Sequence, residues 1–256
     1  MTQKPFGLIC PISKACEILQ PRWTIQVLTE LWCGSTRFND IQRGVGSISR
    51  GLLSKRLKEL VELGLVERVH DKAAGTIDYL RTNRAIELEP ALNSLAVWAQ
   101  RNIEADRALC DTNLSQLMWG TRRGIISDEL PKRRVVIRFH FGDADTQYDT
   151  YWMLTQPGAK VEMCTHDPEF DVDLFVETTI ISFGAIAIGR STIAREIESG
   201  SLFLSGDARI ARTMDRWLGV SDYASVEGIK MLPETILREN RNDEMIARPV
   251  ESNPAL

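Results

Sequence analysis

The chain of 256 residues lacks the long apolar stretch that a membrane-spanning protein needs. A helix that crosses a bilayer takes roughly 18 or more consecutive apolar residues, and every apolar run in this sequence is far shorter. The first ten residues, MTQKPFGLIC, also hold no apolar core of the kind that secretory signals have. We therefore expect a cytoplasmic protein with no membrane partner.

Cysteine is scarce, and its spacing disfavours two common ways of stabilising a small fold. The five cysteines are an odd number and include no CxxC pair, which argues against a disulfide framework and against structural zinc. Five further residues near expected strand ends carry metal-ligand side chains, but they show no HxxxH or comparable spacing. They are His140, Asp143, Asp145, His166 and Asp167. We expect no bound metal.

The motifs of common enzyme chemistry are also missing. The sequence contains no phosphate-binding loop, no GxGxxG and no Ser-His-Asp pattern. We expect neither catalysis nor a cofactor.

Neither sign of charge dominates, which argues against a protein that simply coats nucleic acid. The net charge is −4. Residues 1–110 hold 15 Lys and Arg against 12 Asp and Glu, whereas residues 111–256 hold 16 against 23. Residues 37–58 hold six basic side chains and only Asp40 as an acid. A local basic patch on a mildly acidic protein is typical of a specific contact with DNA.

Residues 49–65 carry the clearest helical pattern in the chain. Four apolar residues recur at helical spacing, small and basic residues occupy the other side, and Gly64 is placed to end the helix. Residues 65–69 and 77–80 then read as two strands around a turn at 71–76. A helix of this kind followed by a hairpin is the outline of a winged helix-turn-helix, whose helix enters the DNA major groove. The apolar residues are Leu53, Leu57, Leu60 and Val61.

Three shorter helices precede this one, at residues 12–19, 23–32 and 37–43, with a turn at 44–47. Several short motifs in this region stand in the order found in HxlR-type winged-helix transcription regulators, which residues 8–103 resemble. The motifs are Cys10-Pro11-Ile12, Arg22-Trp23-Thr24, Arg37-Phe38-Asn39-Asp40-Ile41, Ile48-Ser49-Arg50, Leu53-Ser54-Lys55-Arg56-Leu57-Lys58-Glu59-Leu60 and Gly64-Leu65-Val66. Where this family has a Leu and a Gly after the second strand, the chain has Arg81 and Ala85, so the next helix is expected to begin differently.

Seven residues of this domain are candidates for contact with double-stranded DNA. Arg and Lys side chains pair with guanine or phosphate, and Ser bonds either base or phosphate. The alternative is a solvated helix face, which a basic helix outside a winged helix would more often be. The candidates are Arg37, Ser49, Arg50, Ser54, Lys55, Lys58 and Lys72.

Residues 86–107 are expected to form one long helix that begins or kinks near Pro90. Its apolar face needs a partner, and the family resemblance implies a second copy of the chain. The alternative is that this face packs on the second domain of its own chain. The expected dimer residues are Leu88, Leu92, Leu95, Trp98 and Ala99.

A second, α+β domain is expected over residues 112–224, after a first domain over 1–107. Helices are expected at 114–123, 180–188, 192–198 and 207–218, and five strands at 135–141, 150–155, 160–165, 170–177 and 201–205. This order loosely resembles sterol-carrier-protein-like domains, which implies an apolar cavity between the sheet and the helices. The alternative is a filled core. The expected lining residues are Phe139, Phe141, Trp152, Leu174, Phe183, Ile186 and Trp217. Residues 225–256 are expected to be a polar tail, mobile after about residue 238.

The sequence therefore predicts a homodimeric transcription regulator on a pseudo-palindromic operator, controlled by an apolar or amphipathic small molecule in the second domain. In a second hypothesis the switch is Cys10, which matches a cysteine that senses oxidants in some members of the family, and the second domain is architectural. The alternative for Cys10 is a packed apolar cysteine. A third hypothesis is a lipid carrier or enzyme that uses the winged helix as a scaffold.

Overall fold

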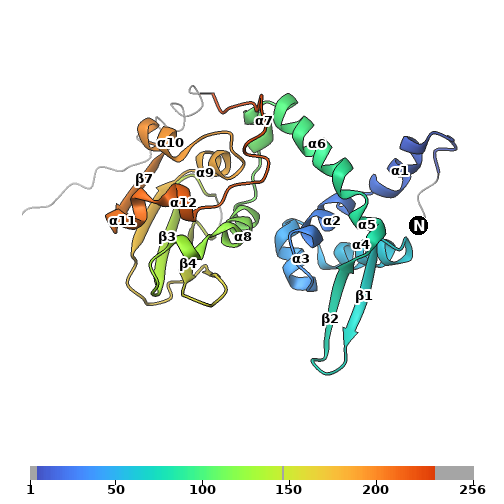
Figure 1. The fold of residues 1–256 in the computed structure, drawn as a ribbon, viewed down its shortest axis with the longest axis horizontal. Helices are drawn as coiled ribbons and strands as arrows, with labels where there is room; N and C mark the ends of the chain where they lie inside the picture. Colours follow the sequence, from blue (N-terminus) through green and yellow to red (C-terminus); the bar gives the residue numbers. More distant parts are fainter. Residues whose placement is uncertain (1–4, 146, 234–256) are drawn as a thin grey trace, which may run out of the picture. The chain divides into compact units, whose positions relative to one another are not determined.

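Figure 1 shows the fold of the computed structural model, which describes residues 5–145 and 147–233. Its buried apolar residues form one cluster in the first part of the chain and two in the second. The chain divides into two units between Asn93 and Ser94. This division falls inside helix α6 (Glu89–Asn102), whereas the sequence placed the boundary at 107–112. The tail expected to be mobile after residue 238 lies outside the described residues.

The first unit is a winged helix-turn-helix, as expected. Its hairpin is antiparallel and pairs in one continuous register from Val66 opposite Arg81 to Asp71 opposite Thr76 (Figure 1). The elements are α1 (Pro11–Leu19), α2 (Thr24–Trp32), α3 (Phe38–Val45), α4 (Arg50–Glu62), β1 (Val66–Asp71), β2 (Thr76–Arg81) and α5 (Asn83–Ile86).

The core of this unit joins α2 and α4. Leu53, Leu57 and Leu60 of α4 are buried, and they pack in one cluster with Val27 and Leu28 of α2. Burial of each such side chain contributes roughly 1.5–3 kcal/mol to folding. The helical spacing of the leucines therefore decides which side of α4 faces inward and which side faces solvent.

A buried carboxylate fixes the approach of α3 to α2. Glu30 of α2 is 4% exposed, and the Ser35 hydroxyl donates to its Oε1 at 2.6 Å. Gly44 of α3 lies directly against this carboxylate, because a Cβ built at Gly44 would be 1.9 Å from Cδ of Glu30. Only glycine leaves room for the acid at this helix crossing.

The helix expected over residues 86–107 begins at Glu89, near Pro90 as expected, but it ends at Asn102 and does not continue to residue 107. The structure has α5, then α6, and then α7 (Ala105–Leu109). Pro90 lies at the second position of α6, where its missing N–H costs no helical hydrogen bond. At the other end of α6, Arg190 donates to the carbonyls of Ala99 (3.2 Å) and Ile103 (2.7 Å), which ends the helix.

The second unit is an α+β fold with a five-stranded sheet, as expected. The strand order is β5-β4-β3-β6-β7, and all neighbours are antiparallel except the parallel pair β3 and β6. The strands are β3 (Val135–Phe141), β4 (Thr150–Thr155), β5 (Glu162–Cys164), β6 (Leu174–Thr178) and β7 (Leu202–Gly206). The helices, with α7 and a 3₁₀ turn at Ser127–Glu129, are α8 (Leu114–Gly124), α9 (Ile180–Ala187), α10 (Ile193–Ser199), α11 (Ala208–Arg212) and α12 (Met214–Trp217).

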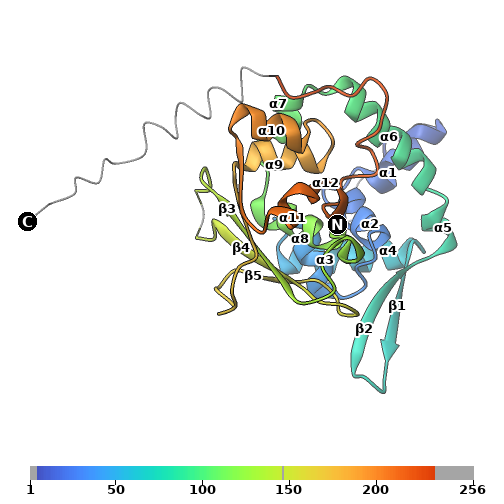
Figure 2. The same cartoon turned by 60° about the vertical axis from the view of Figure 1, so that its left-hand side comes forward.

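Helices α8, α9, α11 and α12 lie against one face of the sheet (Figure 2), and α7 packs against α9. Alternate residues of β3 and β4 enter this core, while Arg138 and Trp152 lie on the opposite face as neighbours in register. Within the part of the chain that the structure describes, no helix is long and apolar enough to cross a membrane.

Two expected elements of this unit differ from the structure. The strand expected from residue 170 begins at Leu174, because the Asp173 side chain accepts from the backbone N–H of Val136 at 2.8 Å and the regular pairing starts after it. The helix expected over 207–218 is two helices. They meet at Thr213, whose hydroxyl donates to the carbonyl of Arg209 at 3.0 Å.

We predict that Gly44→Ala destabilises the first unit, because the added methyl group overlaps Glu30. Overpacking of this kind costs roughly 1–3 kcal/mol, which urea unfolding of the purified protein measures. Gly51→Ala is the matched control, since a Cβ at Gly51 of α4 meets no atom within 4 Å. The control is expected to raise the free energy of unfolding by up to about 1 kcal/mol. Equal effects of the two substitutions would contradict the role given to Gly44.

Candidate nucleic-acid interface

The helix-turn-helix is made by α3 and α4 and by the four residues between them. Gly46 has a φ of +82°, a conformation that few residues other than glycine adopt. Ser49 is the N-cap of α4, and its hydroxyl accepts from the backbone N–H of Leu52 at 3.3 Å. The turn and the cap together fix where α4 begins.

The solvent side of α4 carries most of the sequence-predicted DNA candidates. Ser49, Arg50, Ser54, Lys55 and Lys58 are all exposed. Ser54, Lys55 and Lys58 lie on the side of α4 away from the buried leucines, as the helical spacing predicts, whereas Ser49 and Arg50 are exposed at the N-terminal end of the helix. The structure therefore brings five of the seven candidates onto one helix.

The two lysines of α4 are paired with acids of the same helix. The Nζ of Lys55 is 3.9 Å from Oε1 of Glu59, and the Nζ of Lys58 is 3.8 Å from Oε1 of Glu62. Exposed pairs at this spacing contribute only about 0.3–0.5 kcal/mol. A phosphate group can therefore displace either acid at small cost.

Arg37 is more firmly held. It is the N-cap residue of α3, and its Nε lies 2.9 Å from Oδ1 of Asp78 in β2. The Thr36 hydroxyl donates to the same carboxylate oxygen at 2.6 Å. Arg37 thus links the start of α3 to the wing, and any contact with phosphate would be shared with Asp78.

Lys72 lies in the turn of the wing, and its side chain is exposed. The neighbouring Asp71 accepts from the backbone N–H groups of Ala73 (2.9 Å) and Ala74 (3.0 Å). This Asx turn shapes the tip of the hairpin and leaves Lys72 pointing to solvent. The seventh candidate is therefore on a different element from the other six.

The sequence did not single out Asn39 and Gln42 of α3. Both contact Arg50, whose Nη1 donates to Oδ1 of Asn39 at 3.2 Å and to Oε1 of Gln42 at 3.4 Å. The Arg50 guanidinium also lies 5.2 Å from the centre of the Phe38 ring. A search for basic residues alone cannot find neutral partners, but the spacing of Asn39 and Gln42 on one face of α3 was a usable signal.

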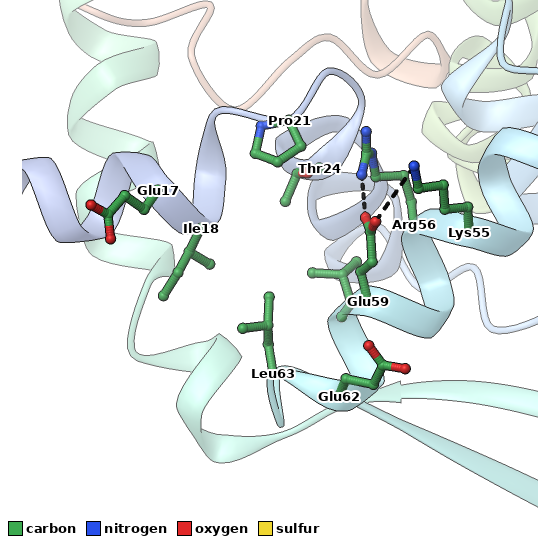
Figure 3. A pocket seen from close by; sticks show the side chains of 10 residues that line it. Glu17, Ile18, Pro21, Thr24, Lys55, Arg56, Glu59, Glu62 and Leu63 are labelled. Carbon is green, nitrogen blue, oxygen red and sulfur yellow. Dashed lines mark hydrogen bonds and ion pairs between the residues drawn. The ribbon is translucent and has the colours of Figure 1, made fainter. Parts of the chain in front are cut away.

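A groove of about 580 Å³ lies beside α4, between the end of α1 and the start of α2. Figure 3 shows Lys55 and Arg56 directed toward Glu59 on one wall, with Ile18 and Leu63 facing each other nearby. Arg56 also donates from Nε to the carbonyl of Arg22 at 2.9 Å. Arg56 therefore braces α4 on the loop before α2, while Lys55 lies between the groove and the exposed side of α4.

Cys10 is the N-cap residue of α1, and it is exposed. Hydrogen bonds from the backbone N–H groups of Ser13 and Ile12 lower the pKa of its thiol, because they stabilise the thiolate.

The expected dimer residues differ in their surroundings. Leu92 is 8% exposed, and Leu88 packs at the edge of the first core. Leu95 and Trp98 are each 57% exposed, and Ala99 is half-buried. Helix α1 has no buried residue, and large apolar side chains around its start are exposed. These are Phe6, Leu8, Ile9 and Ile12.

Six of the seven expected ligand-pocket residues belong to the packed core of the second unit and are at most 2% exposed. Phe183, for example, lies 5.5 Å from Phe139 and 5.7 Å from Phe141 between ring centres. Trp152 is the exception, because it lies on the other face of β4. Nowhere in residues 5–145 and 147–233 do three or more acidic, His or Cys side chains gather as a metal site would require.

A three-helix unit with a basic, exposed helix and a wing defines a winged-helix DNA-binding protein. The HxlR-like helix-turn-helix family matches residues 18–107. The uncharacterized HTH-type transcriptional regulator YvaP of Bacillus subtilis is 36% identical over 98 residues, which are 38% of this chain and 91% of YvaP. The HTH-type transcriptional regulator YodB of the same organism is 29% identical over 105 residues, covering 40% and 94% of the two chains. The chain belongs to the HxlR-like helix-turn-helix family.

Among solved structures, the reduced form of YodB aligns with 38% of this chain and 97% of its own, at 28% identity and a TM-score of 0.35. The family match ends at residue 107, so the five-stranded sheet, which begins at Val135, lies outside it.

Proposed function

We propose that this protein is a sequence-specific transcription regulator that binds a pseudo-palindromic operator as a homodimer. The observation that carries the proposal is α4, whose apolar side is buried against α2 while its serine and basic side chains face solvent. In a winged-helix dimer the two such helices enter successive major grooves, roughly 34 Å apart. The relatives are HTH-type transcriptional regulators, which supports the same function.

The exposed apolar residues of α1 and α6 support the dimer. Leu95 and Trp98 are separated by about one turn of α6, and both are exposed to solvent in the single chain. Gln100 on the same helix is 7% exposed and donates to the carbonyl of Ile188 at 2.7 Å. The side of α6 that carries Gln100 thus packs within its own chain, and the side that carries Leu95 and Trp98 is available to a second chain.

We expect Leu95→Glu combined with Trp98→Glu to convert the dimer into a monomer, because two carboxylates would be buried in the interface. Sedimentation equilibrium of the purified protein gives the mass. The matched control is Ile197→Glu in α10, an apolar residue that is 46% exposed and lies outside α1 and α6. The control is expected to keep a two-chain mass. A mass of one chain for the unmodified protein would contradict the proposed dimer.

Cys10 supports a second candidate function, a thiol switch. A low pKa and exposure are the two properties that make a cysteine reactive at neutral pH. The backbone N–H groups of Ser13 and Ile12 lower the pKa of the Cys10 thiol, and the position of Cys10 at the start of α1 leaves it exposed. In this account oxidation of Cys10 alters DNA binding, and the five-stranded unit is architectural.

The pH dependence of alkylation tests the thiol. In a variant that keeps Cys10 and replaces the other four cysteines with serine, half-maximal reaction with iodoacetamide is expected below the pH found for a cysteine in a short peptide. The sign follows from the lowered pKa, which increases the thiolate fraction at neutral pH. Half-maximal reaction at or above the peptide value would refute the thiol switch, as would a Cys10→Ser protein that keeps its oxidant response.

Control by an apolar ligand in the second unit stays a proposal that rests on the sequence resemblance. The tight packing around Phe183 means that a ligand must open this core to enter. A ligand that does so is expected to raise the unfolding temperature of the protein and to change its affinity for DNA. Long-chain fatty acids and sterols that change neither would exclude this form of control.

A further inference from the structure

Arg50 is the first residue of α4, and one edge of its guanidinium group is fixed by α3. Its Nη1 donates to the side-chain oxygens of Asn39 (3.2 Å) and Gln42 (3.4 Å). The ring of Phe38 lies beneath the group, 5.2 Å from Cζ. Three side chains from α3 therefore hold one arginine at the N-terminal end of the exposed helix.

The amide of Gln42 is itself oriented by the turn. Its Nε2 donates to the carbonyl of Ile48 at 3.3 Å, so its Oε1 is the atom that faces Arg50. The hydrogen-bond network thus fixes which end of the amide accepts. Because both acceptors are neutral amide oxygens, neither of them offsets the positive charge of Arg50 as a carboxylate would.

The other edge of the guanidinium is available. Within the described ranges, Nε and Nη2 of Arg50 have no protein acceptor, and the residue is exposed. The other basic candidates of this region are held by carboxylates, Arg37 by Asp78 and the lysines of α4 by glutamates. Arg50 differs from them because its orientation is set while its charge and its donor pair remain unused.

A planar pair of N–H donors matches the O6 and N7 acceptors of guanine in the major groove. The N-terminal residues of a recognition helix are the ones that reach base edges. We propose that Arg50 reads a guanine in each half-site through Nε and Nη2, and that Asn39 is the residue that positions it. This inference rests on the proposed function, and it assigns base recognition to Arg50 and phosphate contact to Lys72.

The test is selection of binding sites from a pool of duplexes that are random over about two turns of helix. The full-length protein, Arg50→Lys and Asn39→Ala are each used for selection and sequencing. Arg50→Lys keeps the charge and loses the planar fork, so it is expected to reduce the preference for guanine at one position of each half-site by roughly 5-fold to 150-fold. Asn39→Ala is expected to reduce the same preference by less and to leave the other positions unchanged.

Two control variants separate positioning from general binding. Asp40→Ala removes the acid that pairs with Arg43 on the same helix, and it is expected to leave the base profile intact. Lys72→Ala is expected to weaken binding to all duplexes alike and to lower the salt slope by about 0.9, as loss of one phosphate contact does. Thermal unfolding of each variant verifies that it is folded.

The selection experiment distinguishes failure of the proposed function from failure of the role given to Arg50. A full-length protein that enriches no duplex sequence would remove the proposed function, and this inference with it. A full-length protein that enriches a sequence which Arg50→Lys enriches equally would leave the regulator in place and overturn the role of Arg50. A base profile unchanged by Asn39→Ala would overturn the positioning role alone.

Discussion

The packing of three leucines of α4 against α2 is the interaction on which the rest of the first unit depends. Leu53, Leu57 and Leu60 are each at most 1% exposed, and their burial fixes the rotation of α4 about its own axis. Once that rotation is set, the small and basic residues have only the solvent side left. The wing and the N-cap at Ser49 then settle where the helix begins and what flanks it. The exposed basic surface of α4 is thus a consequence of the core.

A second constraint explains why the chain divides within α6. Arg190 is 2% exposed, and it donates to Oε1 of Gln100 at 2.9 Å as well as to the last carbonyls of α6. A buried guanidinium must have its donors satisfied, and the end of a helix offers free carbonyls. Leu92, near the start of α6, is 8% exposed and lies in the first unit. One helix therefore spans the division between the two units, which the apolar periodicity of the sequence does not reveal.

The sequence predicts what is local and periodic. The spacing of the leucines predicted α4, and Gly64, which has a φ of +69°, follows the end of that helix. The alternation of apolar residues predicted β3 with its observed bounds. The helix expected over 86–107 is interrupted where Arg190 bonds a carbonyl near its end, and the helix expected over 207–218 is interrupted at the Thr213 hydroxyl. The spacing of apolar residues in the sequence does not reveal these hydrogen bonds. The same holds at the exposed basic surface of α4. Basic residues identified α4, but only the fold brings Asn39 of α3 to Arg50.

The most direct test is a salt titration of the purified protein on a duplex obtained by selection, against a scrambled duplex of equal length. A sequence-specific regulator is expected to bind the selected duplex about 1,000-fold or more tighter, with affinity that falls steeply as salt rises. Equal affinity for the two duplexes, or no binding to either at low salt, would contradict the central claim and leave the winged helix as a scaffold.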